Sequence, residues 1–346
     1  MPVFEIDPQK DRRWAALVES HPCSSIFHTP EWLDALRKTY GYTPSVLTTC
    51  PDATPLTNGI VVCHVKSWLT GSKLVSVPFS DHCDPLVQDQ TQLKVLLAAI
   101  RDQTAGKSKY AEIRPRFIEP EAGDWAALNP YCFHAIDLRP SLEELHSNLH
   151  KDGVQRKIRR ADREGVVLTE GRSDLLITQF YRLMVLTRRR HGLPPQPESW
   201  FRMLVECLGP RLTIHVASAG GQPIASILTL RHKQTLVYKY GCSDERFHNM
   251  GAMPRLFWHA IQKAKSENLE EFDLGRSDED NPGLVRFKDH LGASKTSINY
   301  WQFPKPSGSR GGLNAALQSS VVQSMLHRMP DSLFRLAGRI FYRHAG

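Results

Sequence analysis

The stretch that decides the fold is residues 238–261, YKYGCSDERFHNMGAMPRLFWHAI, in which a predicted strand runs through a short loop into a predicted helix. The helix is amphipathic, with apolar residues at Leu256, Phe257, Ala260 and Ile261. The first amide groups of a helix lack partners within the helix and lie at the positive end of its dipole. We therefore expect phosphate groups to bind where this helix begins.

The segments on either side extend this pattern into a complete α/β unit. Residues 211–244 predict three consecutive strands, with Gly220 and Gly221 forming a tight hairpin turn. A strand at 270–275, a short helix at 285–292 and a last strand at 297–303 follow the central helix. A long amphipathic helix at 174–192 precedes them.

The first half repeats this order with different residues. Its predicted elements are a helix from Thr29, a pair of strands, another strand, a helix and a final strand, with the last three at 73–79, 92–104 and 110–116. We therefore predict an α/β fold of two tandem units, each a mixed, mostly antiparallel sheet flanked by helices. The predicted boundaries are 1–135, 136–304 and a linker with a tail at 305–346; a basic helix at 141–165 leads into the second unit.

Composition favours an ordinary globular protein with an anionic ligand. Hydrophobic residues make up 41% of the 346 residues, and the net charge is +8. The seven cysteines are scattered, with no CxxC or Cys/His cluster, so the sequence predicts neither a disulfide framework nor a metal site. The N-terminus lacks a signal-peptide pattern, and no apolar run is long enough to span a bilayer. We expect a cytoplasmic protein.

The loop before the central helix has a spacing found in one acyltransferase superfamily. Arg246-x-x-Asn249-x-Gly251 fits the GNAT pyrophosphate loop, (Gln/Arg)-x-x-Gly-x-(Gly/Ala), with Asn249 in place of the first glycine. Asparagine also visits left-handed backbone conformations, so the replacement is compatible with the loop. An ordinary tight turn is the alternative. We predict that the donor is bound by Arg246, Asn249, Met250, Gly251 and Ala252.

Two further segments make the resemblance more specific. FDLGRS at 272–277 and GLVRFKDHLGA at 283–293 resemble the Fem-family peptidyltransferases, tandem GNAT-like proteins that add amino acids to peptidoglycan precursors. The chain looks closest to FemAB-like proteins found beside exopolysaccharide export genes. The resemblance covers about residues 24–303 and includes HTPEWLDAL and VSVPFSDHCDPL.

This resemblance implies roles for individual residues. Phe287 and Lys288 match a pair at the donor end of the family's cleft, where the lysine is important for activity; a solvated surface lysine is the alternative. We expect Lys288→Met to lower turnover and leave stability nearly unchanged. Asp273 and Arg276 are predicted either to be catalytic or to form a structural ion pair.

The acceptor side is predicted from three residues. We expect Arg156, Arg160 and Tyr238 to bind the substrate, although the basic helix can also be a solvated face and Tyr238 can simply pack. The charged helical hairpin that some Fem enzymes use to contact transfer RNA has no counterpart here. Its absence argues against aminoacyl-tRNA as the donor and leaves acyl-CoA open. Either donor would act as a co-substrate, with no tightly bound cofactor.

These observations predict an N-acyltransferase in which an amine attacks the donor directly, without a covalent enzyme intermediate. The resemblance implies a cell-envelope or exopolysaccharide acceptor, in the form of a phosphorylated small molecule or a lipid-linked precursor. The alternative is a non-catalytic RNA-binding or scaffold protein, although the basic stretches contain almost no aromatic residues for base stacking.

The tail, residues 313–346, shows apolar residues at helical spacing, interrupted by Pro330 and accompanied by several arginines. This pattern fits a helix on an anionic membrane surface. It also fits a helix packed on the body of the protein. We expect truncation after Gly311 to separate the two, because only the loss of a packed helix lowers the melting temperature.

Overall fold

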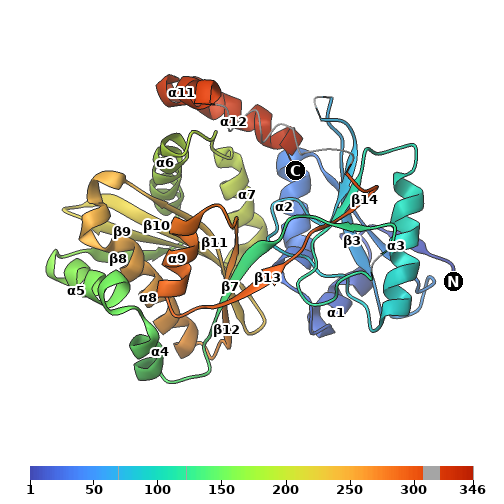
Figure 1. The fold of residues 1–346 in the computed structure, drawn as a ribbon, viewed down its shortest axis with the longest axis horizontal. Helices are drawn as coiled ribbons and strands as arrows, with labels where there is room; N and C mark the ends of the chain where they lie inside the picture. The colour runs from blue at the N-terminus through green and yellow to red at the C-terminus, as the bar shows by residue number, and fades with distance from the viewer. Residues whose placement is uncertain (69, 122, 307–319, 346) are drawn as a thin grey trace. The chain divides into compact units, whose positions relative to one another are not determined.

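The computed structural model describes residues 1–68, 70–121, 123–306 and 320–345, which fold as two compact units (Figure 1). Unit 1 contains Met1–Pro130, Ile298–Ser319 and Leu336–Gly346, and unit 2 contains Tyr131–Ser297 and Ser320–Arg335. Each unit is a mixed sheet flanked by helices, as the sequence predicts.

Unit 1 is built on a sheet with the strand order β1-β2-β3-β4-β5-β14-β6. Its neighbours pair antiparallel except for β4 and β5, which are parallel. Its strands are β1 (Phe4–Ile6), β2 (Thr43–Thr48), β3 (Ile60–Val65), β4 (Lys73–Val75), β5 (Ala111–Ile113), β6 (Ala126–Ala127) and β14 (Trp301–Phe303). Its helices are α1 (Arg12–Ser20), a 3-10 turn (Ile26–His28), α2 (Pro30–Tyr40) and α3 (Gln90–Thr104).

Unit 2 has the sheet order β13-β7-β12-β11-β10-β9-β8. Here β11 and β12 form the parallel pair. The strands are β7 (Tyr131–Asp137), β8 (Val167–Gly171), β9 (Leu212–Ala219), β10 (Gln222–His232), β11 (Thr235–Ser243), β12 (Glu271–Ser277) and β13 (Ser294–Ile298). The helical segments are α4 (Leu142–Asn148), a π turn (Lys151–Gln155), α5 (Arg156–Arg163), α6 (Asp174–Arg190), α7 (Glu198–Leu208), 3-10 turns (Gly209–Arg211, Glu245–Met250), α8 (Ala252–Ser266), α9 (Pro282–His290) and α11 (Ser320–Arg328).

The boundaries of the two units differ from the predicted ones. The predicted division after residue 135 falls inside β7, which belongs entirely to unit 2. The predicted last strand at 297–303 is two strands: β13 joins the sheet of unit 2, and β14 joins the sheet of unit 1. The prediction treated each unit as one continuous segment, whereas the chain after residue 297 contributes to unit 1, then to unit 2 and then to unit 1 again.

Local sequence explains where the helices begin and end. The Thr29 side chain accepts a hydrogen bond from Trp32 N at the start of α2, Pro30 occupies the first turn, and Gly41 ends the helix with φ of 72°. The predicted basic helix at 141–165 is interrupted instead. After α4, a π turn is fixed by a hydrogen bond from Gly153 N to His150 Nδ1, and α5 follows.

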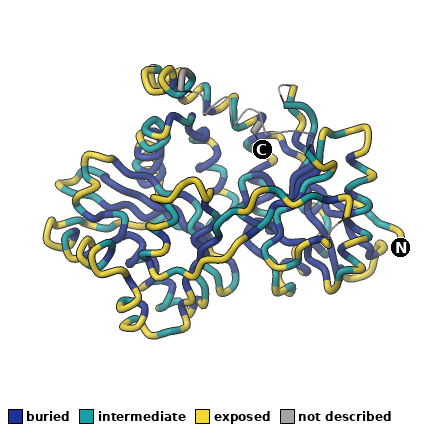
Figure 2. The backbone as a smooth tube through the Cα atoms, viewed as in Figure 1, coloured by how far each residue is buried: buried dark blue, intermediate teal, exposed yellow. Residues whose placement is uncertain are grey.

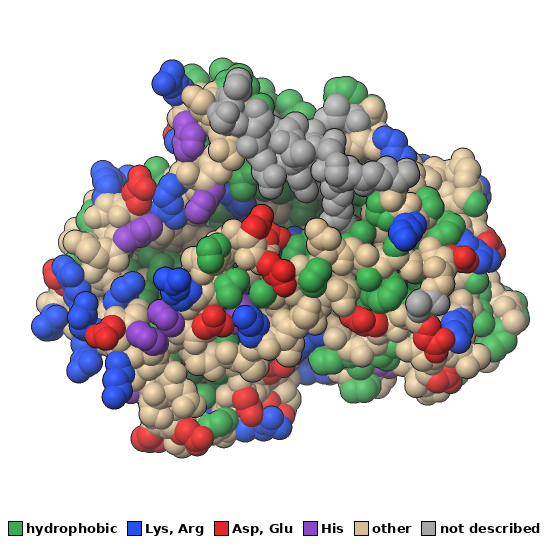
Figure 3. Space-filling view, in the orientation of Figure 1, with side chains coloured by type: hydrophobic (Ala, Val, Ile, Leu, Met, Phe, Trp, Pro, Cys, Tyr) green, Lys and Arg blue, Asp and Glu red, His purple; other side chains and the backbone are tan. Residues whose placement is uncertain are grey.

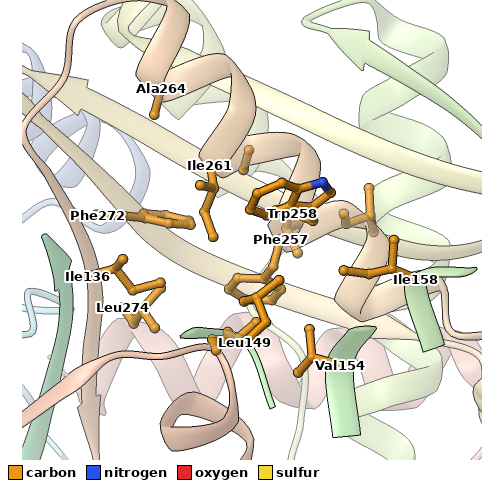
Figure 4. Close-up of a cluster of buried hydrophobic side chains, with 14 of the residues drawn as sticks. Ile136, Leu149, Val154, Ile158, Phe257, Trp258, Ile261, Ala264, Phe272 and Leu274 are labelled. Carbon is orange, nitrogen blue, oxygen red and sulfur yellow. The ribbon is translucent and has the colours of Figure 1, made fainter. Parts of the chain in front are cut away.

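The core of unit 2 lies between α8 and the sheet. Phe257 and Ile261 of α8 pack toward Phe272 and Leu274 of β12, and Ile158 of α5 joins the same cluster (Figure 4). Buried residues follow the strands, while the outer turns and helix faces are exposed (Figure 2). The cluster therefore fixes the start of α8, where the sequence predicts the donor site, relative to β12.

The C-terminal helices are partly packed. Arg189 of α6 donates to the carbonyl oxygens of Leu326, His327 and Met329, and its guanidinium lies 4.4 Å from the ring centroid of buried Phe334. α12 (Asp331–Ala345) starts in unit 2 and ends in unit 1. The packed alternative for the tail is therefore confirmed for this part of it; residues 313–319 lie outside the described residues.

Candidate functional site at the parting of two parallel strands

The central feature of unit 2 is the point where β11 and β12 separate. The two strands pair over three residues of each, ending at Val237 and Asp273. Beyond that point β11 stays paired with β10 as far as Ser243, and β12 stays paired with β7 as far as Ser277. The sheet therefore parts between two strands that both continue, and backbone groups there become available to a ligand.

The loop after β11 is held by a buried carboxylate. Asp244 is 4% exposed, and its side chain accepts hydrogen bonds from Arg246 N and from the Arg246 guanidinium. The guanidinium lowers the pKa of Asp244. Arg246 itself remains 66% exposed, so it can still meet an anionic ligand. The first turn of α8 contains Pro254, which has no N–H group, and this leaves Ala252 and Met253 as its amide donors before Arg255.

Gly251 has a packing role that the loop motif does not predict. It has φ of 77° and begins α8, but a Cβ atom at this position would overlap the backbone carbonyl of Lys157 in α5. The glycine therefore accommodates the backbone of α5, and its predicted contact with the donor stays a prediction. Asn249 and Met250 end the 3-10 turn just before it.

Lys288 is a buried residue, which excludes the solvated-surface alternative. It is 2% exposed, and its Nζ donates to the carbonyl oxygens of Gly275 (2.9 Å) and Arg276 (3.1 Å). Both carbonyls belong to the part of β12 that β11 no longer pairs with. Lys288 therefore holds α9 against the part of β12 that lies beyond its pairing with β11.

A bulge in β12 brings Asp273 and Arg276 into this arrangement. The pairing of β12 with β7 shifts between these residues, and Gly275 has φ of 71°. Buried Asp273 accepts a hydrogen bond from Gly275 N (2.6 Å). Arg276 lies over the ring of Tyr131 at 4.1 Å and bonds to Asp278. These contacts shape the backbone that Lys288 holds.

An apolar group surrounds the same region. Tyr238 of β11 and Phe287 of α9 each pack against Phe257 of α8, with ring centroids 4.8 and 5.3 Å apart. Phe247, Met250 and Met253, from the loop and the start of α8, are among the other partly buried residues packed against this core. The predicted residues Tyr238 and Phe287 therefore lie on one apolar cluster, which suits an acyl chain or the arm that carries it.

Sequence reasoning missed a polar group at the end of β11. Ser243 Oγ lies 2.8 Å from His248 Nε2, and Thr187 exchanges hydrogen bonds with the Ser243 backbone. Arg190 donates to the Ser243 carbonyl. Burial, followed by the Arg190 cation, lowers the pKa of His248, which favours a neutral imidazole beside the loop. The signal in the sequence was weak, because α6 and the loop are far apart along the chain.

His134 was also missed, although it attaches α9 to β7. It is fully buried in β7, and its Nε2 lies 3.1 Å from Asp289 Oδ1. Burial lowers the pKa of His134. The helix that carries Lys288 is therefore fixed to both β7 and β12.

Arg156 and Arg160 lie on α5, whose buried face is formed by Ile158 and Ala161. Arg156 lies 3.6 Å from Asp152, and Arg160 lies 3.4 Å from Glu164, in exposed or half-exposed pairs. Lys and Arg side chains gather on this side of unit 2 (Figure 3). The basic face is therefore available to an anionic partner. The ion pairs of Arg156 and Arg160 are with Asp152 and Glu164, and neither partner belongs to β11 or β12.

Comparison with known proteins agrees with this geometry. Residues 150–289 match the family model described as an acetyltransferase (GNAT) domain, and this range includes the parting strands and Lys288. The chain is 25% identical over 172 residues to the UDP-N-acetylmuramoylpentapeptide-lysine N(6)-alanyltransferase of Weissella viridescens. That match covers 49% of the chain and 51% of the alanyltransferase, about half the length of each.

Residues 150–289 therefore resemble a GNAT domain, and the chain as a whole is similar to FemAB-like proteins. The FemX crystal structure has the same fold, with a TM-score of 0.65 and 14% identity over 88% of this chain and 98% of FemX. A tandem GNAT protein from the clavulanic acid pathway gives a TM-score of 0.52 and 9% identity, covering 89% and 99% of the two chains. The predicted fold and the predicted resemblance to FemAB-like proteins are thereby confirmed.

The first prediction compares two glycines that have the same φ of 77°. Alanine at either position has to adopt a left-handed backbone, which costs about 1–2 kcal/mol. Gly221→Ala has open space around the new methyl group, whereas Gly251→Ala also meets the backbone of α5. We expect Gly251→Ala to lower the free energy of unfolding clearly more than Gly221→Ala in chemical denaturation. Equal losses would show that α5 does not pack on this loop.

The second prediction concerns Lys288→Met, which keeps a long, unbranched side chain but removes the donor to two carbonyl oxygens. A buried acceptor left unsatisfied costs about 1–3 kcal/mol. Burial thus argues against the sequence-based expectation of unchanged stability, and we expect a lower melting temperature. Exposed Lys295→Met is the matched control, with a change within about 0.5 kcal/mol. Identical melting curves for the two variants would contradict this account.

Proposed function

We propose that this FemAB-like chain transfers an acyl or aminoacyl group to an amine of a cell-envelope precursor. The observation that carries the proposal is the parting of β11 and β12, flanked by the Arg246–Ala252 loop and by Lys288. The alanyltransferase relative acts, by its name, on the lysine of a UDP-N-acetylmuramoylpentapeptide. A related amine acceptor, phosphorylated or linked to a lipid, is therefore proposed here, including the exopolysaccharide precursors that the sequence suggests.

The proposed reaction needs positioning more than covalent chemistry. The donor's phosphates bind the amides of Ala252 and Met253 with Arg246 beside them, and the acyl arm lies on the apolar cluster of Tyr238 and Phe287. The amine attacks the donor carbonyl directly, and backbone amides at the parting stabilise the oxyanion. A neutral His248 can accept the proton that the amine loses, directly or through water. Collapse of the tetrahedral intermediate then breaks the thioester or ester bond of the donor and releases free CoA or uncharged tRNA.

The donor is proposed to be acyl-CoA or aminoacyl-tRNA, because each carries phosphates next to an activated acyl group. The exposed basic face of α5 supports a larger polyanionic donor. The apolar cluster supports the arm of acyl-CoA. One binding experiment can decide between them.

The third prediction is that one of these donors raises the melting temperature of the full chain, as expected for a ligand of the folded state. Arg246→Ala should weaken that donor's affinity about tenfold or more, because a hydrogen bond to a charged group contributes about 1.5–3 kcal/mol. Arg231→Ala is the control: Arg231 also has an acidic partner, Glu267, but Glu267 lies at the other end of α8. If neither donor binds, or if both variants bind normally, the proposed site is wrong.

We also propose that α12 brings the protein to an anionic membrane on the cytoplasmic side. No described helix is long and apolar enough to cross a bilayer. However, Leu333, Leu336 and Ile340 are 53%, 50% and 49% exposed on α12, at the i, i+3, i+7 spacing of one helix face. Exposed Arg335, Arg339 and Arg343 accompany them, a combination that suits an anionic lipid surface.

The fourth prediction is that the full chain sediments with vesicles containing anionic phospholipid at low salt and is released as salt rises. Leu336→Ser with Ile340→Ser should reduce this binding without changing the melting temperature, because both side chains are half-exposed. A chain that ignores anionic vesicles at low salt would leave α12 with only its packed role.

A further inference from the structure

Three side chains from three separate elements meet at one edge of unit 2. They are Glu170 of β8, His215 of β9 and His259 of α8, and their ligand-type atoms all lie within 4.8 Å of one another. Glu170 Oε2 lies 3.1 Å from His215 Nδ1 and 3.2 Å from His259 Nε2. We call this group the Glu170 cluster. None of its members was among the residues that the sequence singled out.

His215 has the least ordinary environment of the three. It is 2% exposed, and among the described residues its Nδ1 has no hydrogen-bond partner, despite its closeness to Glu170 Oε2. Buried polar atoms are normally satisfied, so this nitrogen calls for an explanation. Two ligand atoms of one metal ion lie close together in this way, without being aligned for a hydrogen bond to each other.

The distances and the surroundings fit a small cation. Zinc binds imidazole nitrogens and carboxylate oxygens at about 2.0–2.2 Å in tetrahedral geometry, which separates neighbouring ligand atoms by roughly 3.3 Å. The other ring nitrogen of His215 lies 3.0 Å from Thr229 Oγ1. A hydrogen bond there would fix the ring and its tautomer, as the outer partners of metal-bound histidines do.

The ligand types also favour a divalent metal ion. Two imidazoles and one carboxylate form a set typical of zinc and similar divalent ions. The side chains of Glu170 and His259 are each 32% exposed, which leaves room for water as a fourth ligand.

Lys263 is the feature that opposes a cation. It lies one turn after His259 on α8, and its Nζ contacts Glu170 Oε1. The alternative to a metal is thus a polar network in which Lys263 neutralises Glu170. The two explanations predict opposite effects of removing Lys263. The polar network would lose a partner of Glu170, whereas a metal site would lose a positive charge that repels the ion.

We propose that Glu170, His215 and His259 bind one divalent transition-metal ion of the zinc class. The ion would join α8 to β8 and β9 on an edge of the sheet. The sequence predicts no metal site because recognisable zinc patterns have closely spaced ligands, whereas these three residues are spread from position 170 to position 259. The site is independent of the acyl transfer proposed above.

The fifth prediction uses full-length protein treated with chelator and then titrated with Zn²⁺ by calorimetry and with Co²⁺ by visible absorption. We expect one equivalent to bind, the Co²⁺ spectrum to show low-coordinate geometry, and Zn²⁺ to raise the melting temperature. His259→Ala should abolish this site, and Thr229→Val should weaken it about 10–100-fold. His327→Ala, which removes an exposed imidazole of α11, should change nothing.

Lys263→Met decides between the two explanations. For a metal site, we expect tighter Zn²⁺ binding than in the parent protein, because the competing ammonium is gone. Absence of stoichiometric binding in the parent, or the same Co²⁺ spectrum in His259→Ala, would overturn the proposal. Weaker Zn²⁺ binding by Lys263→Met would also count against it.

Discussion

The short parallel pairing of β11 and β12 is the constraint on which the rest of unit 2 depends. Both strands continue after Val237 and Asp273, but each stays with its other neighbour, so the backbone along the parting needs other partners. Lys288 supplies a donor to two carbonyl oxygens of β12, and Asp273 accepts the amide of Gly275. The loop after β11 then leads directly into α8. Fold and candidate site thus follow from one interruption in the sheet.

Unit 1 has the same strand arrangement but treats the corresponding position differently. Its parallel pair is β4 and β5. Between β4 and α3 the chain forms a connection of residues 76–89, which is longer than the loop between β11 and α8. That connection is bonded into the unit itself: Asp84 accepts the amides of Arg116 and Phe117, and Arg114 donates to the carbonyl oxygens of Val77 and Ser80. No short loop leads into a helix there. This contrast is why the donor site is proposed in unit 2.

The sequence predicted the elements of this fold well where the signals were local. The cap at Thr29, the hairpin at Gly220 and Gly221, and the strand-loop-helix run into α8 each depend on neighbouring residues. The sheets that β7 and β14 join could not be predicted in this way, because they depend on pairing between distant segments. The packing of α5 against Gly251 could not be predicted for the same reason. The loop pattern is local, but the α5 backbone that the glycine accommodates belongs to a distant segment.

The candidate site follows the same division. Phe287 and Lys288 were found through a resemblance between motifs, yet the burial of Lys288 and its bonds to β12 required coordinates. His134, Ser243 and His248 were missed because their partners, Asp289 and residues of α6, lie far away or in ordinary-looking segments. Short-range patterns identified the loop and the helix, while the contacts that hold them came from tertiary packing.

The most direct measurement of the central claim is amide hydrogen exchange of the full chain with and without saturating donor. If the donor binds at the parting of β11 and β12, protection should increase in residues 238–253 and 274–277 and remain unchanged along β9 and at the β9–β10 turn. Protection confined to other segments, with the amides of the parting strands and of the start of α8 exchanging as in the free protein, would contradict the account.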